Sequence, residues 1–343
     1  MHIFALNNQL LIENNIQDIR GINPKGLILL WAFAESGIGG ILHALKLPFT
    51  GIFVGGIAVM AIALLAYYTE NRKTILQALG IVLLVKLAVS PHSPWQAYVA
   101  VIFQGYFGYL VFNSRKYFKL KSFIFSLICL LESAIQKILM ALLIYGQKMM
   151  EAVDAAALSV LKSFGLQADT SLVSIVFGTY ITLHLVVGIV LGIWIPAIPE
   201  QIKSLRVTLP ENSNLTYSQS KSKGWKAIIG GFVILAALLL TIKLLVPSMK
   251  ISDITFIFLR SLLISLGLIF IIGPFLKMII LRITKKQISG DQKMLKDVME
   301  SIPKFASRAS SLLQWVNKEY SGMARIKNFI LGLLWISLKY NDD

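Results

Sequence analysis

Residues 27–45 read LILLWAFAESGIGGILHAL, and this stretch decides the class of fold. It is an apolar run of about the length that an α-helix needs to cross the hydrocarbon core of a membrane. Its one acidic residue, Glu35, lies near the middle. A charge at that depth is costly, so Glu35 is predicted to have a buried partner or a function.

The composition of the whole chain also indicates a membrane protein. Of 343 residues, 56% are hydrophobic and 15% are charged, and the mean hydropathy is +0.72. Soluble domains carry about 25% charged residues. A soluble globule with so few charges would have to bury more apolar surface than its geometry allows. This excludes a soluble enzyme, a disordered chain and, despite the net charge of +16, a nucleic-acid-binding domain.

Seven further apolar stretches follow the first, which predicts an all-α polytopic membrane protein with about eight transmembrane helices. The third and fourth stretches flank SPHSPWQ, residues 90–96, whose two prolines cannot continue a helix. The predicted spans are 27–45, 51–68, 75–90, 97–112, 122–145, 171–196, 226–247 and 254–281.

The basic residues alternate between the two sides of this arrangement. Twenty-four Lys and Arg residues fall in the N-terminal segment, in the loops after spans two, four and six, and in the tail. The alternate loops hold only Lys46, Lys148, Lys162 and Lys250. By the positive-inside rule, both termini are predicted to be cytoplasmic and the protein to lie in the inner membrane. The opening segment has no basic n-region, so the first span is expected to direct insertion.

Polar composition divides the chain into four parts. Residues 1–202 form a six-helix membrane domain, 203–224 a polar cytoplasmic linker, 225–281 a two-helix membrane unit and 282–343 a basic amphipathic tail. Two interpretations of the tail stay open, because its apolar residues have helical spacing with lysines between them. It binds anionic membrane lipid or it docks a cytoplasmic partner. Residues 146–170, on the outside, are predicted to contain an amphipathic surface helix.

Most predicted binding residues fall in the outer half of the bilayer or just above it. Polar groups there are functional candidates, since a pocket for a small solute needs convergent polar groups on an apolar wall. This group comprises His43, Thr50, Lys86, Ser90, His92, Ser93, Trp95, Gln96 and Tyr98. Glu35 in the first span and His184 in the sixth complete the set.

Several of these residues also have a structural interpretation. Lys86 suits a carboxylate or phosphate ligand, but it can equally pair with Glu35 inside the bundle. Trp95 and Tyr98 can belong to the aromatic belt, and His184 to the bundle core. Further polar residues lie within spans, namely Gln104, Glu132, Gln136, Lys137 and Tyr180. Glu132 and Gln136 are interpreted as packing contacts, because residues four apart share a helix face.

The sequence lacks motifs for catalysis, metal binding and nucleotide binding. The single cysteine, Cys129, cannot form an internal disulfide or a CxxC site. No GxSxG, HExxH or Walker motif occurs, and no HxxxH spacing supports a metal site. The sequence therefore predicts neither an enzyme nor a bound cofactor, and ATP hydrolysis would have to come from another protein.

Ala32, Ser36 and Gly40 are spaced by four and form a small-residue face on the first span. Such a face lets another helix approach closely, either inside the chain or in a partner. With six spans, cytoplasmic ends and polar loops, this layout resembles the S-component of energy-coupling-factor (ECF) vitamin transporters over about residues 1–200. Ala32-xxx-Ser36 stands at the AxxxA position of that family, LPFTG in the first loop and SPHSPWQ in the third.

The resemblance implies a substrate-binding subunit that takes up a small, vitamin-like solute and works with a separate coupling subunit and ATPases. It implies that Ala32, Ser36 and Gly40 dock the coupling subunit. Residues 225–343 are not part of the family pattern. The alternative function is a non-catalytic scaffold of an inner-membrane complex that docks partners through its basic tail.

Overall fold

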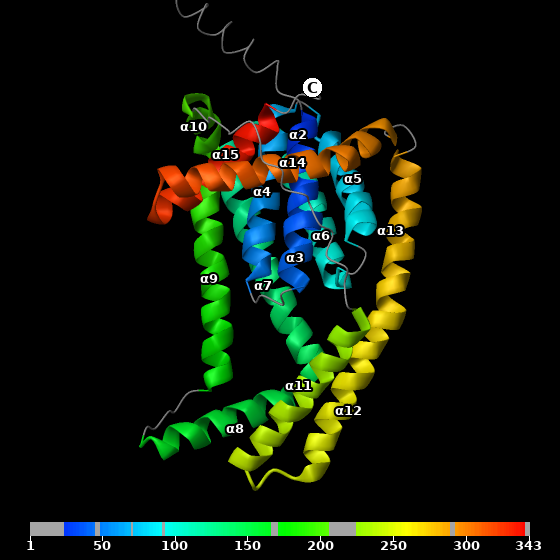
Figure 1. The fold of residues 1–343 in the computed structure, drawn as a ribbon, viewed down its shortest axis with the longest axis vertical. Helices are drawn as coiled ribbons and strands as arrows, with labels where there is room; N and C mark the ends of the chain where they lie inside the picture. The colour runs from blue at the N-terminus through cyan, green and yellow to red at the C-terminus, as the bar shows by residue number, and fades with distance from the viewer. Residues whose placement is uncertain are drawn as a thin grey trace, which may run out of the picture.

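The computed structural model describes residues 24–44, 49–69, 71–90, 93–165, 171–205, 224–288 and 292–339, and within these ranges every regular element is a helix. Figure 1 shows a bundle of upright helices with one helix, α14, lying across one end. The elements are α2 (Pro24–Phe33), η1 (Ala34–Ile38), α3 (Gly39–Ala44), α4 (Thr50–Tyr68), α5 (Lys73–Val89), α6 (Trp95–Val111), α7 (Phe118–Tyr145), α8 (Gln147–Ser163), α9 (Leu172–Trp194), η2 (Ile195–Ala197), α10 (Ile198–Ser204), α11 (Gly224–Leu245), α12 (Ile251–Gly267), η3 (Leu268–Ile272), α13 (Gly273–Ile288), α14 (Gln292–Glu319) and α15 (Gly322–Leu338).

Six of these helical stretches are long and apolar enough to cross a membrane, so the chain is an all-α, multi-pass membrane protein. They are Pro24–Leu42, Thr50–Tyr68, Phe118–Tyr145, Leu172–Ser204, Ile228–Leu245 and Ile251–Thr284. Helices also occupy the other two predicted spans, as α5 and α6, each of 17 residues. The total of eight spans and the cytoplasmic termini stay predictions.

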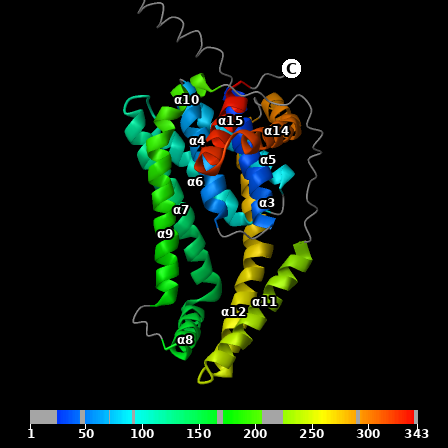
Figure 2. The same cartoon turned by 60° about the vertical axis from the view of Figure 1, so that its left-hand side comes forward.

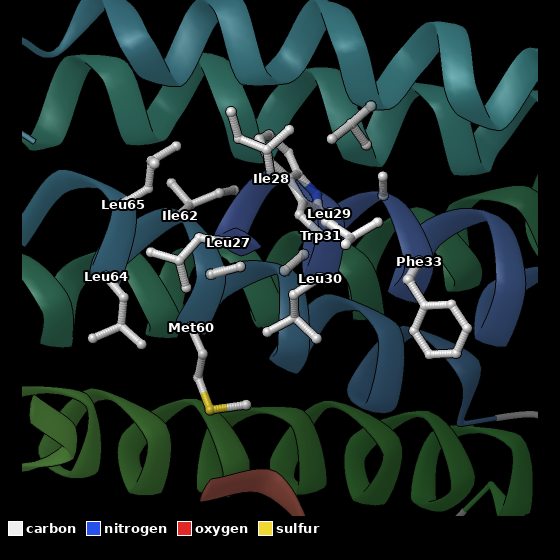
Figure 3. Close-up of a cluster of buried hydrophobic side chains, with 14 of the residues drawn as sticks. Leu27, Ile28, Leu29, Leu30, Trp31, Phe33, Met60, Ile62, Leu64 and Leu65 are labelled. Atoms are coloured by element: carbon white, nitrogen blue, oxygen red, sulfur yellow. The ribbon is translucent and has the colours of Figure 1, made fainter. Parts of the chain in front are cut away.

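Helix α2 is the centre of the bundle. Leu27, Leu29, Leu30 and Trp31 are fully buried, and Ile28 is 1% exposed. Figure 3 shows these side chains packed with Met60, Ile62, Leu64 and Leu65 of α4. Helices α5, α14 and α15 also contact α2. A helix that is apolar on every side is stable only when neighbours surround it, which explains the even hydrophobicity of residues 27–34.

The small-residue face of the first span is used inside the chain. Ala32 is fully buried and Ser36 is 3% exposed, and the Ser36 hydroxyl donates to the Ala32 carbonyl at 2.5 Å. A Cβ atom on Gly40 would lie 3.0 Å from Oγ of Ser90, just beyond α5. The chain's own helices thus cover Ala32 and Ser36, whereas Gly40 is half-buried, and this packing favours the interpretation of the face as a contact inside the chain.

Helices α7 and α9 pack closely through glycine. A Cβ atom on Gly192 would lie 2.7 Å from Cα of Phe123, and one on Gly188 would lie 3.1 Å from Cα of Leu127. Only residues without a side chain allow two backbones to approach so closely. The lipid-facing side of α9 is apolar, with Val190 and Ile193 exposed.

Helix α8 confirms the predicted helix in the segment 146–170 and is tied to the start of α9. Asp154 accepts hydrogen bonds from the Ser171 hydroxyl at 2.5 Å and from the Val173 backbone N–H at 2.9 Å. Ser171 is itself the N-cap of α9 and accepts from the N–H of Ser174. The bond from Ser171 and those from the α9 backbone lower the pKa of the Asp154 carboxyl.

We expect Asp154→Asn to loosen the α8–α9 corner, because the charged acceptor of the first α9 N–H groups is lost. The expected result is faster hydrogen exchange of the Val173 amide, with Ser163→Ala as a control at the end of α8. Because the folded pKa is lowered, the stabilisation by Asp154 is complete above the unfolded pKa. It is lost as the pH falls through the folded value. Unchanged exchange in the variant at neutral pH would contradict this role.

The C-terminal unit, formed by α11, α12, η3 and α13, runs alongside the bundle. Helices α12, η3 and α13 follow one another without a break, and α13 packs on α5. Figure 2 shows α11 and α12 as a pair that extends beyond the other helices at the end where α8 lies. Arg260 of α12 joins this unit to α7, since its Nη2 group donates to the Leu143 carbonyl at 3.4 Å, near the last turn of α7. A cation is favourable at a helix C-terminus.

The basic tail folds back onto the bundle. Val298, Ile302 and Phe305 of α14 are buried, and Phe305 meets the ring of Phe33 edge-on at 5.3 Å. Lys25 at the start of α2 pairs with Asp297 at 3.3 Å. The apolar face of α14 therefore packs on the chain's own α2, an arrangement that neither interpretation of the tail described.

Candidate functional site

A chamber of about 260 Å³ lies between η1, α4, α6, α7 and α9. These helices contribute the halves that lie farther from α14 and α15 (Figure 1). By the predicted orientation this is the outer half of the bilayer. The lining residues are Glu35, Thr50, Gly51, Val54, Gly55, Pro94, Gln96, Ala97, Ala100, Gln104, Ser133, Gln136, Lys137, Met140 and Tyr180. The lining therefore combines small and apolar residues with amide, hydroxyl and charged groups.

The strongest polar interaction at the chamber is a buried ion pair. Nζ of Lys86 lies 2.6 Å from Oε2 of Glu35, and the two side chains are 0% and 5% exposed. Glu35 also lines the chamber, whereas Lys86 lies behind it. Because a buried charge needs a partner, Lys86 stabilises Glu35 at the chamber wall, which also includes Lys137.

The same lysine supports an irregular turn of the first span. Residues Ala34–Ile38 form a π-helical turn, which interrupts the regular hydrogen-bond ladder. Nζ of Lys86 donates to the Glu35 backbone carbonyl at 3.2 Å. Lys86 therefore holds both the carboxylate and the backbone of Glu35, and it fixes where this residue meets the chamber.

Tyr98 connects this pair to the C-terminal unit. Its ring is fully buried and lies 5.8 Å from Nζ of Lys86 and 5.9 Å from Nζ of Lys277 on α13. Both distances allow a cation–π interaction. The Tyr98 hydroxyl points to the Ser90 carbonyl at 3.4 Å. Tyr98 thus supports the chamber wall from behind and does not line it.

Three glutamine amides surround the chamber. Nε2 of Gln136 donates to the Gln96 backbone carbonyl at 3.2 Å. The side-chain oxygens of Gln96 and Gln104 are buried without a hydrogen-bond partner among the described residues. An unpartnered buried amide oxygen is costly. Since the terminal torsion of glutamine is soft, a small rotation can bring either oxygen to a ligand in the chamber.

Two glycines of α4 make room for these polar groups. A Cβ atom on Gly51 would overlap Oγ of Ser133, and one on Gly55 would lie 3.3 Å from Nε2 of Gln104. His184 is next to this wall, fully buried, with Nδ1 2.8 Å from the Tyr180 carbonyl. Its other ring nitrogen has no partner within the described chain.

The structure brings only part of the predicted set to the chamber. Glu35, Thr50 and Gln96 line it. Lys86 and Tyr98 lie behind the wall, and His184 lies beside Tyr180, with 4.3 Å between their ring centroids. Ser90 and Ser93 bond to each other at 2.8 Å within the α5–α6 connection, and Trp95 starts α6 without lining the cavity. The side chain of His43 and all of His92 lie outside the described residues.

Gln104, Ser133, Gln136, Lys137 and Tyr180 line the chamber but were not predicted as binding residues. All but Ser133 carry the signal that could have found them, a strongly polar group inside an apolar span. Gln136, interpreted as a packing residue, joins α7 to α6, because its amide donates to the Gln96 carbonyl. Among the described residues, no three His, Cys, Asp or Glu side chains are placed to hold a metal ion.

Comparison with family models, with curated proteins and with solved structures finds no significant match for this chain.

Proposed function

We propose that this protein is the solute-binding membrane subunit of an uptake system, and that the chamber is its binding site. The observation that carries the proposal is the chamber itself. It is a cavity of about 260 Å³ inside a membrane bundle, and it combines a held carboxylate with three amides and with unpartnered amide oxygens. Pockets for small molecules have this composition, an apolar wall with a few convergent polar groups.

The lining favours a polar solute without net negative charge. Lys86, the residue expected to hold an anion, is fully buried and paired with Glu35. Lys137 also lines the chamber and has an interaction of its own. The remaining polar groups are amides and hydroxyls, which offer both donors and acceptors. Tyr180 is the one aromatic residue in the described lining, so ring stacking contributes little.

Filling the chamber is expected to abolish solute binding. Ala100→Phe adds a ring from α6 into the cavity, whereas Ala237→Phe makes the same change at an exposed position of α11. The purified wild-type protein and A237F are expected to retain one small molecule, detected by mass spectrometry after denaturation. A100F is expected to release none while keeping its thermal stability. Equal retention by A100F, or no enriched molecule in the wild-type protein, would overturn the proposal.

The S-component resemblance extends the proposal to the partners. In this scheme the solute enters from outside, both termini are cytoplasmic and the membrane is the inner membrane. Separate ATPases supply energy, together with a coupling subunit that must dock elsewhere than on Ala32 and Ser36, which are buried. A copurified ATPase pair in mild detergent would support this part. If the solute is retained but no ATPase copurifies, the proposal that the chamber binds a solute still holds, and the proposed ATPase partnership is contradicted.

The scaffold function is the second candidate. The observation that favours it is the exposed polar side of α14, with Lys296, Lys304 and Arg308 at the surface. The apolar side of α14 already packs on α2, so a partner would have to bind to the charged residues on its exposed side. Charge-reversal of Lys304 and Arg308 should then release that partner without affecting solute retention.

A further inference from the structure

The turn between α14 and α15 carries exposed apolar side chains beside basic ones. Met323 is 80% exposed, Ile326 is 55% exposed and Leu313 is 44% exposed. We call residues 313–327 the turn segment. Its charged residues are Lys318, Glu319, Arg325 and Lys327, a net charge of +2. Large apolar residues exposed on one helix face, as Met323 and Ile326 are, indicate a contact surface and not a solvated loop.

Met323 and Ile326, the two large exposed apolar residues of α15, lie on one side of this helix. Met323, Ile326 and Lys327 are spaced by three and four, which places them on the same helix face. Further along α15, Leu331, Leu333 and Leu334 are buried in the core. Only the beginning of this helix therefore stands clear of the protein, with its apolar side uncovered.

The base of the turn segment is rigid. Nε of Arg325 donates to the Tyr320 backbone carbonyl at 3.2 Å. The rings of Trp315 and Tyr320 meet edge-on, with 5.6 Å between their centroids. Tryptophan and tyrosine are enriched where a membrane meets water, because their rings are apolar and their edges are polar.

The turn segment lies level with one end of the exposed apolar surface of α9. Figures 1 and 2 show the C-terminal end of α14 level with the end of α9 that joins η2. At that end, Ile193 of α9 is 68% exposed, so the apolar band that faces lipid extends to this level. Figure 1 also shows α14 extending past α9, to the side of the bundle.

We propose that the turn segment binds the anionic phospholipid surface of the leaflet on the side of α14. Met323 and Ile326 enter the boundary between headgroups and acyl chains, and Lys318 and Lys327 interact with phosphate groups. This is the combination that holds amphipathic segments at anionic membranes. The proposal does not rest on solute binding.

Site-specific fluorescence tests the proposal in the full-length protein. Met323→Cys and, as a control, Lys304→Cys on the exposed side of α14 are labelled with an environment-sensitive fluorophore. The wild-type protein, whose single cysteine is buried, is the labelling blank. Each protein is reconstituted into vesicles of phosphatidylcholine, with and without phosphatidylglycerol. We expect the label at 323 to be shielded from aqueous acrylamide and quenched by nitroxides on the acyl chains, most strongly with phosphatidylglycerol.

The control and a charge-reversed variant make the result decisive. The label at 304 is expected to stay open to acrylamide in both vesicles. Lys318→Glu with Lys327→Glu, in the M323C background, is expected to remove the increase that phosphatidylglycerol causes. Equal acrylamide quenching at 323 and 304 would overturn the proposal. Shielding at 323 without quenching by acyl-chain nitroxides would overturn it too, and would indicate a protein contact.

Discussion

Lys86→Met is expected to destabilise the protein by about 3–5 kcal/mol, the cost of removing one partner from a buried ion pair. The substitution keeps the volume of the side chain but leaves the Glu35 carboxylate buried without its cation. It also removes the donor to the Glu35 carbonyl in the π-helical turn. The loss is measured from the unfolding transition of the purified protein in mild detergent, with denaturant or heat.

A double-mutant cycle separates the charge from the packing. Glu35→Gln combined with Lys86→Met removes both charges at nearly constant volume, and we expect it to recover most of the lost stability. The backbone carbonyl of Glu35 would still lack its donor, so recovery should be incomplete. If the double variant is less stable than K86M, the ion pair is not the reason for the effect. Solute retention by the double variant then reports whether the chamber needs the carboxylate itself.

Gly192→Ala is expected to have the second large effect on the stability of the protein. Its new Cβ atom would lie 2.7 Å from Cα of Phe123 and 2.7 Å from Oγ of Ser126. The serine hydroxyl can rotate away, but a backbone atom cannot, so α7 and α9 must separate. Overpacking of this kind costs about 1–3 kcal/mol. The expected result is a lower unfolding midpoint and weaker solute retention, since α7 and α9 both line the chamber.

Gly178→Ala is the matched control on the same helix. Nothing lies within 4 Å of a Cβ atom at that position, which is exposed. The same chemical change should therefore be neutral or slightly stabilising, because alanine is the better helix former. Equal losses from G192A and G178A would show that the α7–α9 contact does not depend on glycine.

The class of fold and the positions of the helices could be predicted from the sequence, because the length of an apolar segment is a property of that segment alone. All eight predicted spans coincide with helices. The pairing of Lys86 with Glu35 was also accessible as one of two interpretations, since two opposite charges inside apolar spans have strong reason to meet.

Which distant segments contact one another could not be predicted from the sequence. Helical spacing identified the apolar side of α14, but it could not show that α2 covers it, because lipid and a neighbouring helix are equally apolar. For the same reason, the small-residue face at Ala32 pointed to a helix contact without identifying the helix. Gln104 and Gln136 were visible as polar residues, but only the structure shows that they border one cavity.

The central position of α2 has a consequence for how the protein is made. Helix α2 acquires two of its neighbours, α14 and α15, only after residues 292–338 have been synthesised. The Lys25–Asp297 pair joins residues 272 positions apart. Domains generally form as units in the order of synthesis, but this core cannot close until α14 and α15 have been synthesised. A nascent chain interrupted before α14 would therefore lack these contacts and leave the end of α2 that carries Lys25 open to quality-control proteases.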